Sequence, residues 1–551
     1  MKKHTIFRLL AIALLCLIAT QGALAKKNTS VVKLSKQERE DVVAHARAFL
    51  LPRGADVALN LTVGAVYRNH VLLKDWTHRT FAIVARDSAA ECLKERVLAF
   101  SMGTTLARDH NDEGIYQFLN YYDRTLQSMR EGRLASERAL ANDTIKRRAV
   151  PSLLKYIKWR QFHLRNQGSD IPKGSLTGCG PTALAQIMAY YHHPMNCIDW
   201  ERTDYSYVYP KGDTASITPL LVRIGRAVKA EYGVKGTGVQ MDNMLYGMVR
   251  EFDFSPRAMY LCNMTERDVL IAVHRNLLGQ RPSLMCGRNH LFVCDGYHGG
   301  YFHLNMGWSG NYDGWYRFIT PGATVGFGSM LDGVIVNIVP RTEAEKTWVE
   351  VDCPQPGTLP EVIGEVRRED IGQLRVKGSL NGRDIHFLRQ MAGYVSPENL
   401  LSWHGALTRL DLSEAKIVAD SAYYFRYDAA QYNLWLTWNK KRYQFNKMTH
   451  DQWLEIAETR AVRNNYFDVV EVVADSLYQV SVKTQANTIG QYMFCQCHNL
   501  REVKFPRSTR SVSRFVLHGC PLLESVTLPA ENLVKTEVNS LPKCRVERYG
   551  E

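Results

Sequence analysis

The sequence predicts an α+β domain followed by a solenoid of short repeats, and two observations carry that prediction. Within residues 149–342 an apolar helix comes first and a pair of apolar strands comes later. This order is typical of an α+β domain, in which helices and sheet are segregated along the chain. Within residues 361–551 one short pattern recurs at a fixed spacing, as expected for stacked repeats that share one core.

Length and composition indicate a soluble protein of several domains. At 551 residues the chain is too long for one hydrophobic core, so about three domains are expected. Hydrophobic residues make up 45% of the chain and charged residues 23%, as in ordinary globular proteins. The formal net charge is +14, but the lysines and arginines are scattered rather than blocked. No nucleic-acid partner is therefore predicted.

Residues 1–25 have the three parts of a secretory signal. Lys2 and Lys3 form the charged start, an apolar run covers residues 9–18, and Ala-Leu-Ala at residues 23–25 offers a cleavage site. The apolar run is too short for a stable anchor, and no other stretch is apolar enough to cross a bilayer. We therefore expect a secreted or cell-surface protein with no membrane span.

Residues 177–194 place a cysteine between two glycines and continue as a helix that Pro194 ends. Pro181 suits the first turn, and apolar residues recur on one helical face. A thiol at a helix N-terminus lies at the positive end of the helix dipole, which lowers its pKa and makes it a nucleophile. Cys179 is therefore a candidate nucleophile, and the alternative is a buried cysteine that caps a core helix.

Residues 290–317 predict a β-hairpin, because two apolar, aromatic-rich runs flank a Gly-Tyr-His-Gly-Gly turn. His290 opens the first strand and Asn305 lies late in the second, so the two residues lie on adjacent strands. A cysteine at a helix start, a distant histidine and an asparagine that orients it form the arrangement of Cys–His–Asn acyl transfer.

These two segments resemble the C10 family of cysteine peptidases, the streptopain family. Its Gly-Cys-x-x-Thr-Ala-x-Ala-Gln-Ile-Met-x-Tyr helix matches residues 178–190. Its Gly-His-Ala-Phe-Val-x-Asp-Gly strand and Asn-Trp-Gly-Trp-Gly-Gly loop match residues 289–296 and 305–310 with substitutions. Upstream, residues 159–161 resemble the family's Trp-x-Gln. The resemblance covers roughly residues 45–340 and implies a papain-like fold for the catalytic domain.

The resemblance implies a cysteine endopeptidase that hydrolyses proteins or peptides and needs no metal or other cofactor. Cys179 would attack the peptide carbonyl, His290 would protonate the leaving amine, and Asn305 would orient the imidazole. Gln161 and the Cys179 backbone N–H would hold the oxyanion. Trp308 would shield the His–Asn pair from water.

The resemblance further implies that residues 26–148 form an inhibitory α+β propeptide, so that the chain is made as a zymogen. A basic run at residues 146–148 ends this segment, and Arg148 is the expected activation cleavage site. We expect the propeptide to pack near Cys179 or His290, either displacing the histidine or filling the cleft. The alternative is an ordinary interdomain segment.

A few positions depart from the family pattern. Gly180 and Pro181 replace small residues after the nucleophile, and Met306 replaces a tryptophan. Asn289 stands where the family has glycine, and asparagine tolerates left-handed dihedrals. These changes support a second interpretation, a surface adhesin whose peptidase-like domain is weakly active or inactive. A third, a transglutaminase-type acyltransferase, is disfavoured by the helix that follows the nucleophile.

The repeats of residues 361–551 follow a linker predicted at residues 343–360. Cys497 and Cys520 lie 23 residues apart by subtraction of their numbers, as do Leu500 and Leu523. The pattern resembles the BspA-type leucine-rich repeats of bacterial surface proteins, and the face of such a solenoid binds ligands, so we expect a host or surface protein as partner. Equivalent repeat positions favour stacked core cysteines over a zinc site.

Overall fold

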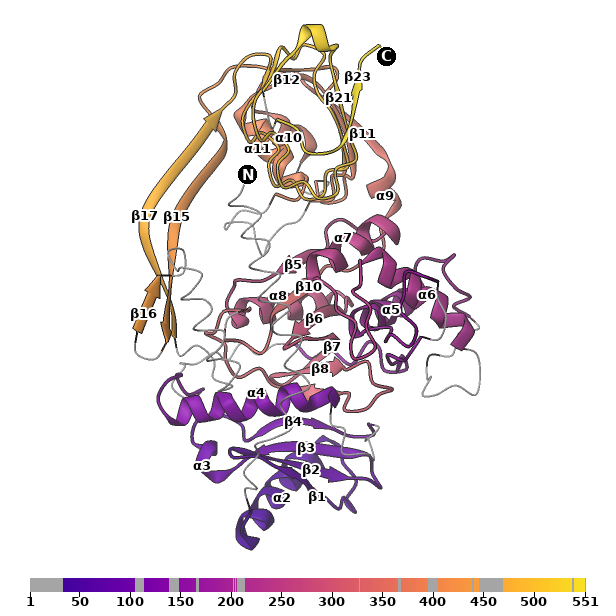
Figure 1. Cartoon of the computed structure of the whole chain (residues 1–551), viewed down its shortest axis with the longest axis vertical. Helices are drawn as coiled ribbons and strands as arrows, with labels where there is room; N and C mark the ends of the chain where they lie inside the picture. The colour runs from indigo at the N-terminus through magenta and orange to yellow at the C-terminus, as the bar shows by residue number, and fades with distance from the viewer. Residues whose placement is uncertain are drawn as a thin grey trace. The chain divides into compact units, whose positions relative to one another are not determined.

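The computed structural model describes residues 33–104, 113–137, 148–164, 168–201, 203, 205, 214–326, 328–364, 368–394, 405–438, 441–444, 469–537 and 540–550. The predicted signal at residues 1–25 and the basic residues 146–147 lie outside the described residues. The chain divides into two compact units, Met1–Thr342 and Glu343–Glu551. Figure 1 draws the first unit in indigo to magenta shades and the repeats in orange and yellow.

The first unit is built on one ten-stranded antiparallel sheet. Its N-terminal strands join the later strands through the pairing of β4 with β9, in which Phe100 faces Trp315. In spatial order the strands are β1 (Thr62–Val66), β2 (His70–Asp75), β3 (Thr80–Ala85), β4 (Val97–Ser101), β9 (Gly314–Tyr316), β8 (Tyr301–Asn305), β7 (His290–His298), β6 (Ser283–Gly287), β10 (Gly333–Val336) and β5 (Met259–Leu261). The segment expected to be a propeptide therefore shares a sheet with the predicted catalytic domain.

Helices cover this sheet (Figure 1). They are α2 (Lys36–Leu50), α3 (Asp87–Ala90), α4 (Glu113–Arg130), α5 (Cys179–Tyr191), α6 (Thr214–Ala227), α7 (Met241–Glu251) and α8 (Glu266–Leu278), with the short 3-10 helix η2 (Leu51–Arg53) after α2. Helix α5 packs against β7, and α2 packs against β3. The interior residues of α5 from Gly180 to Ala189 are buried, so this helix lies in the core and is fixed along almost its whole length.

Aromatic residues of α4 fill the junction between the N-terminal strands and the later strands. The Tyr122 hydroxyl donates to the carbonyl oxygens of Leu98 and Arg317, at 3.1 and 2.8 Å. Phe118 packs against Tyr316 with ring centroids 4.6 Å apart. Arg317 pairs with Glu137. These contacts are buried, so the N-terminal segment is part of the core of this unit rather than an appendage.

The second unit contains a parallel sheet in which successive turns of the chain stack. Its order is β11 (Trp348–Cys353), β12 (Gln373–Leu380), β13 (Arg409–Asp411), β19 (Glu502–Lys504), β21 (Ser525–Leu528) and β23 (Arg545–Arg548), with β14 (Ala415–Ile417) also paired to β12. Val503 of β19 pairs with Val526 of β21, which is the 23-residue spacing seen in the sequence. Strands β18 (Thr488–Ile489), β20 (Ser511–Val512) and β22 (Lys535–Thr536) form a second parallel sheet.

The remaining elements of this unit are α9 (Glu343–Lys346), α10 (Leu359–Ile363), α11 (Gly382–Met391), the 3-10 helix η4 (Glu531–Leu533), and a three-stranded antiparallel sheet of β15 (Tyr423–Trp438), β16 (Lys441–Gln444) and β17 (Val469–Lys483). The linker predicted at residues 343–360 is corrected by this structure. Those residues form α9 and β11 and begin α10, and β11 pairs with β12 over its whole length. They are the first turn of the stacked unit.

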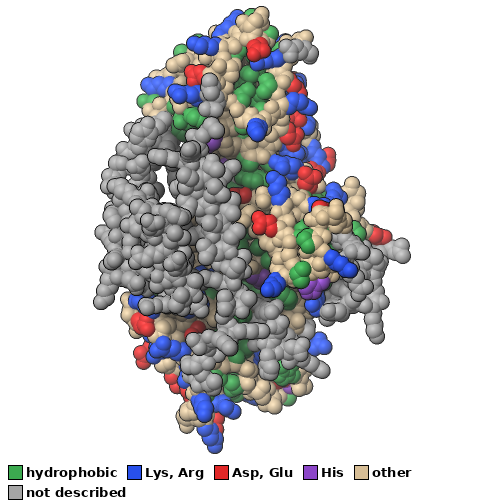
Figure 2. Space-filling model, viewed as in Figure 1, with side chains coloured by type: hydrophobic (Ala, Val, Ile, Leu, Met, Phe, Trp, Pro, Cys, Tyr) green, Lys and Arg blue, Asp and Glu red, His purple; other side chains and the backbone are tan. Residues whose placement is uncertain are grey.

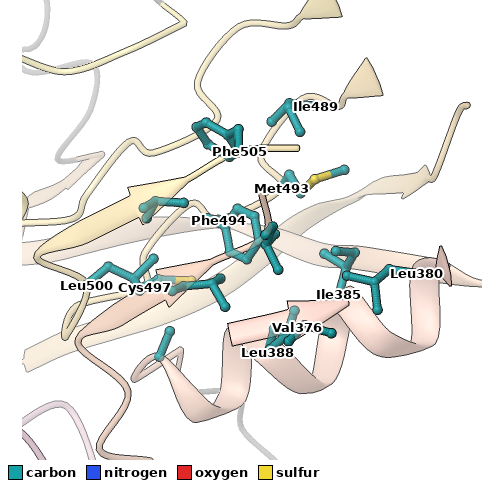
Figure 3. Packing of buried hydrophobic residues seen from close by; sticks show 14 of the residues in the cluster. Val376, Leu380, Ile385, Leu388, Ile489, Met493, Phe494, Cys497, Leu500 and Phe505 are labelled. Carbon is teal, nitrogen blue, oxygen red and sulfur yellow. The ribbon is translucent and has the colours of Figure 1, made fainter. Parts of the chain in front are cut away.

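Figure 3 shows the core of this unit, in which Leu388 of α11 lies close to Val376 of β12, and Phe494 lies near Cys497 and Phe505. Cys497 is fully buried and Cys520 is 8% exposed, and both belong to this core. Burial raises the pKa of Cys497 to about 12, as expected for a thiol among apolar side chains. No group of residues suited to hold a metal ion occurs in the described parts of the chain.

Charged side chains are interspersed over the described surface. On the face that Figure 2 shows, basic and acidic side chains alternate rather than gather into one block. On the sheet of the second unit Arg375 pairs with both Glu350 and Asp411, and Arg409 pairs with Glu502. Opposite charges on neighbouring strands neutralise each other, so this sheet face is not a polyanion-binding surface.

Candidate active site

The candidate nucleophile Cys179 is the first residue of α5. Gly178 before it has φ +91°, a conformation that favours glycine, and a Cβ there would lie 3.0 Å from Thr237 Cγ2. Gly178 accepts the first helical hydrogen bond from the Thr182 N–H at 3.2 Å. Within this first turn the Gly180 N–H interacts with the Cys179 sulfur, and Cys179 as a residue is partly exposed to solvent.

His290 opens β7 and hydrogen-bonds the side chain of Cys179. A tight turn between β6 and β7 brings it there, and Arg288 and Asn289 in that turn have φ of 51° and 71°. Asn289 thus has the left-handed conformation that asparagine tolerates. Asp332 accepts the Arg288 N–H at 2.7 Å and fixes the turn. The packing of α5 on β7 then brings the sulfur and the imidazole together.

The electrostatics of the pair favour a thiolate and an imidazolium. Burial alone raises the pKa of Cys179, but the hydrogen bond and charge of His290, with the backbone N–H groups of Leu291 and Gly180, bring that pKa below its ordinary value. Burial alone lowers the pKa of His290, but the hydrogen bond and charge of Cys179 and the Met306 carbonyl bring it above its ordinary value. Each group therefore stabilises the charged form of the other.

The far side of the His290 ring contacts the loop after β8. Nε2 lies 2.9 Å from the Met306 carbonyl oxygen and 3.3 Å from Trp308 Nε1. The carbonyl accepts a hydrogen bond from a protonated Nε2, whereas the indole N–H donates a hydrogen bond only to an unprotonated Nε2, so the two contacts belong to different protonation states. The Trp308 ring also stacks on the imidazole, with centroids 5.9 Å apart and planes 28° apart.

Asn305 does not orient His290 directly, which corrects the expectation from sequence. Its Nδ2 donates to the Ile157 carbonyl at 2.7 Å, and its Oδ1 accepts the Gly307 N–H at 3.0 Å. The Gly307 N–H belongs to the same peptide as the Met306 carbonyl. Asn305 therefore holds the peptide that in turn holds His290, and the contact to the ring is made by backbone.

Gln161 is buried, in a segment that runs between the two halves of the site. Its neighbour Arg160 forms a β-bridge with Trp308. On the other side, Phe162 exchanges hydrogen bonds with Thr177, whose hydroxyl accepts the Phe162 N–H at 3.1 Å. Gln161 therefore lies between the loop that holds His290 and the approach to Cys179, which is the region where an oxyanion donor would act.

The expected cleavage site Arg148 and the following Ala149 are exposed, and Val150 is buried. Val150 pairs with Tyr297 through backbone hydrogen bonds of 2.7 and 2.8 Å. The Arg148 carbonyl accepts a hydrogen bond from His274 Nε2 at 2.8 Å. The chain after this point is therefore anchored to β7 while the expected cleavage site is at the surface.

The N-terminal segment contacts the loop after β8 but does not displace His290. The Thr104 hydroxyl donates to the Gly310 carbonyl at 2.7 Å. Phe81 packs edge-on against Tyr312, with centroids 5.5 Å apart. His290 nevertheless keeps its hydrogen bond to Cys179. The expectation of a displaced histidine is therefore wrong for this structure.

Two supports of the candidate site were not predicted from the sequence. The Met306 carbonyl orients His290, and Asp313 accepts the Met306 N–H at 2.8 Å. A backbone carbonyl leaves no mark in a sequence. Asp313 carried a weak signal, since it follows the Gly307–Gly310 loop within a turn. Cys179 is a free thiol.

In comparisons with known proteins, two regions of the chain match family models. Residues 197–316 match the model of the peptidase C10 family, and residues 473–546 match that of the BspA type leucine rich repeat region in six copies. Both resemblances predicted from the sequence are thereby confirmed. The C10 match includes His290, Asn305 and Trp308 and begins after Cys179. No curated relative matches the chain.

Two solved structures from Prevotella intermedia are similar to the first unit. A fragment of prointerpain A, a cysteine-to-alanine mutant, is 20% identical and covers 52% of this chain and 100% of its own, with a TM-score of 0.42. The active wild-type interpain A cysteine protease is 24% identical and covers 36% of this chain and 98% of its own, with a TM-score of 0.30. In the described parts of the present chain, none of the helices has the length and hydropathy of a bilayer-spanning segment.

Proposed function

We propose that this chain, which carries a peptidase C10 region ahead of BspA type leucine rich repeats, is a secreted cysteine endopeptidase made as a zymogen. The observation that carries the proposal is the hydrogen-bonded Cys179–His290 pair at the N-terminus of α5. A lowered thiol pKa beside a histidine with a raised pKa is the activated nucleophile of this chemistry. The substrates are proteins or peptides, and no cofactor takes part.

In the first step the Cys179 thiolate attacks the carbonyl carbon of the scissile peptide bond. The His290 imidazolium then gives its proton to the leaving amine as the C–N bond breaks, which leaves an acyl-enzyme on the Cys179 sulfur. In the second step water attacks the thioester carbonyl carbon while His290 accepts its proton, and the C–S bond breaks, which releases the carboxylic acid product and regenerates the Cys179 thiolate. The Met306 carbonyl stays hydrogen-bonded to Nε2, on the side of the ring away from the sulfur, in both steps.

The oxyanion of each tetrahedral intermediate needs donors beside the sulfur. The Cys179 backbone N–H supplies one, because the first N–H groups of a helix have no partner within it. Gln161 supplies the second, since its segment lies between Thr177 and Trp308. Trp308 covers the imidazole and limits the access of water to it.

Residues 26–148 act as the inhibitory segment in this proposal, and cleavage after Arg148 begins activation. The exposure of Arg148 and Ala149 beside a buried Val150 supports the position of the cut. Inhibition does not require displacement of His290. The repeats serve to bind a host or surface protein, and residues 1–25 direct export.

Labelling with a thiol-reactive peptide inhibitor tests this function. The chain cleaved after Arg148 and separated from residues 26–148 should be labelled at Cys179, and Cys179→Ala should abolish both labelling and hydrolysis of a denatured protein substrate. Absence of labelling and hydrolysis in the processed wild-type chain would favour an adhesin with an inactive domain. Transfer of the acyl group to an added amine without hydrolysis would favour an acyltransferase.

A further inference from the structure

Two side chains hold the two peptides on either side of Met306. Asp313 Oδ1 accepts the Met306 N–H at 2.8 Å, and Asn305 Oδ1 accepts the Gly307 N–H at 3.0 Å. Between these two bonds the Met306 carbonyl oxygen lies 2.9 Å from His290 Nε2. The direction of that carbonyl is therefore set by both side chains.

Asp313 is built into the interior behind this loop. It is 8% exposed, and its backbone N–H donates to the Gly310 carbonyl at 3.3 Å. Tyr312 before it has φ of 59°, and the Asn311 N–H donates to the Trp308 carbonyl at 3.0 Å. The turn from Trp308 to Asp313 thus closes on itself and presents the carboxylate to the Met306 N–H.

We propose that Asp313 is a positioning residue for His290, acting through the backbone of Met306. The inference rests on the proposed function of the Cys179–His290 pair. A charge-assisted hydrogen bond to a carboxylate is stronger than one to a neutral acceptor, so Asp313 restrains Met306 most firmly when ionised.

The ionisation of Asp313 gives this role a pH dependence. Burial raises the pKa of Asp313 to about 6, while the Met306 N–H and the charge of His303 act to lower it. The other charged groups that face it are Asp295 of β7, which acts to raise the pKa, and Lys158, which acts to lower it. His303 is itself paired with Asp295 at 2.6 Å. Below about pH 6 Asp313 therefore becomes neutral, and its hold on Met306 weakens.

A merely structural role for Asp313 makes a different prediction. A side chain that only completes the turn would, when replaced, lower the thermal midpoint and the reactivity of Cys179 together. A positioning role predicts different results for the two substitutions Asp313→Asn and Asp313→Ala. Asparagine keeps an oxygen for the Met306 N–H but does not titrate, and alanine removes the acceptor.

The test measures the rate of alkylation of Cys179 by iodoacetamide in the full chain, which requires no peptide hydrolysis. Mass spectrometry of the Cys179 peptide separates it from the other thiols. Rates are followed from about pH 5 to about pH 8, the range in which the groups of interest titrate. Glu266→Gln is the matched control, because Glu266 is also a buried carboxyl group of the same unit and accepts the Thr320 N–H at 3.0 Å rather than the Met306 N–H.

Asp313→Ala is expected to lower the alkylation rate at neutral pH about tenfold, as for loss of one charge-assisted hydrogen bond. Asp313→Asn is expected to keep the alkylation rate at neutral pH within about threefold of the wild-type rate. It should also lose the part of the wild-type fall in rate near pH 6 that comes from protonation of Asp313. Glu266→Gln should leave the profile unchanged. A folded Asp313→Asn chain that keeps the wild-type acid limb would overturn the proposal, even if Asp313→Ala fails to fold.

The same measurements separate this inference from the proposed function. A wild-type Cys179 that reacts no faster than the partly exposed Cys197 would overturn the nucleophile and the role of Asp313 together. A reactive Cys179 whose rate ignores both Asp313 substitutions would overturn the role of Asp313 alone. If the alkylation rate falls in all three variants in proportion to the fall in their thermal midpoints, the positioning role of Asp313 is also rejected.

Discussion

Cys179 and His290 each change the ionisation of the other, and this mutual dependence governs the site at the scale of single residues. Without its partner, each group would be held neutral by burial. The lowered pKa of the thiol and the raised pKa of the imidazole both favour a thiolate–imidazolium pair. Thiolate is lost as the pH falls through the first value, and the proton for the leaving amine is lost as the pH rises through the second.

His290→Ala should therefore raise the pKa of Cys179 above the value of an ordinary thiol, because desolvation, the largest effect, is then opposed only by the backbone N–H groups of Leu291 and Gly180. The ultraviolet absorbance of the thiolate, followed against pH as a difference from Cys179→Ala, measures this shift. Peptide hydrolysis should fall by about a thousandfold, as expected when a general acid–base is removed. A Cys179 pKa that stays low in His290→Ala would show that the helix N-terminus, and not the histidine, activates the thiol.

Asn305→Ala should lower both stability and activity through the backbone. It leaves the Ile157 carbonyl and the Gly307 N–H buried without partners, which costs about 1–3 kcal/mol for each group. The loosened Met306 carbonyl should reduce kcat about 10–100-fold, a smaller loss than that of His290→Ala. Thermal unfolding and steady-state kinetics check the two effects. Loss of kcat equal to that of His290→Ala with an unchanged thermal midpoint would instead indicate direct contact of Asn305 with the ring.

The side chains that carry the chemistry could be predicted from the sequence, because a cysteine at a helix start and a histidine at a strand start leave clear patterns. The partner of the second imidazole nitrogen could not. Asn305 has the right residue type and the right position in its strand, yet its amide bonds Ile157 and Gly307. The register of two strands within the hairpin decides which group reaches the ring, and the sequence leaves that register open.

At the scale of elements, the N-terminus of α5 is fitted to the segment that precedes α7. A Cβ on Gly180 would lie 2.5 Å from Val239 Cγ2, closer than real contacts allow. Gly180 also approaches Met244 Sδ of α7 and Leu291 Cδ2 of β7, at 3.4 and 3.6 Å from that same Cβ position. The glycine that departs from the family pattern at this position therefore leaves room for the side chain of Val239.

Gly180→Ala should accordingly displace either Val239 or the first turn of α5, and so lower kcat/KM about tenfold, since small shifts of a nucleophile are costly. Val239 is partly exposed and can move, so the loss of stability should be modest, about 1 kcal/mol. The double variant Gly180→Ala with Val239→Ala removes the clash and should recover most of the activity. Val239→Ala alone is the control. Failure of the double variant to recover would mean that the glycine is needed for another reason.

Prediction of the elements succeeded where a local pattern repeats and failed where only pairing defines a strand. The spacing of Val503 and Val526 reappears as their parallel pairing. Residues 343–360 lack that repeated pattern and were expected to be a linker. Their strand β11 is stabilised by backbone pairing with β12 and by Cys353 in the shared core. Such non-local pairing is not visible in a short sequence window.

At the scale of the molecule, the sheet of the first unit joins strands that lie on both sides of the expected cleavage site in the sequence. Strand β4 precedes Arg148 and β9 follows it, and the two pair with each other. Tyr122 and Arg317 add buried hydrogen bonds across the same junction. A cut after Arg148 breaks one peptide bond but none of these contacts, so the N-terminal segment should remain bound after cleavage. Activation then needs a second step that removes the segment.

The Cys179→Ala chain, cut after Arg148 by a trypsin-like protease, should therefore elute from a sizing column with its N-terminal segment still associated. N-terminal sequencing should find Ala149 or Val150 as the new start.

Gly314→Val provides the variant that weakens the junction, because a Cβ at Gly314 would lie 2.7 Å from the Phe100 carbonyl oxygen and 2.8 Å from Ser101 Cβ. Gly322→Ala is the control, since a Cβ there meets nothing within 4 Å. The cut Gly314→Val chain should release the segment and, with Cys179 restored, hydrolyse substrate without the second step. Release of the segment from the cut Cys179→Ala chain without Gly314→Val would show that the shared sheet does not retain it. Full activity of an uncut Arg148→Ala chain would refute the zymogen model itself.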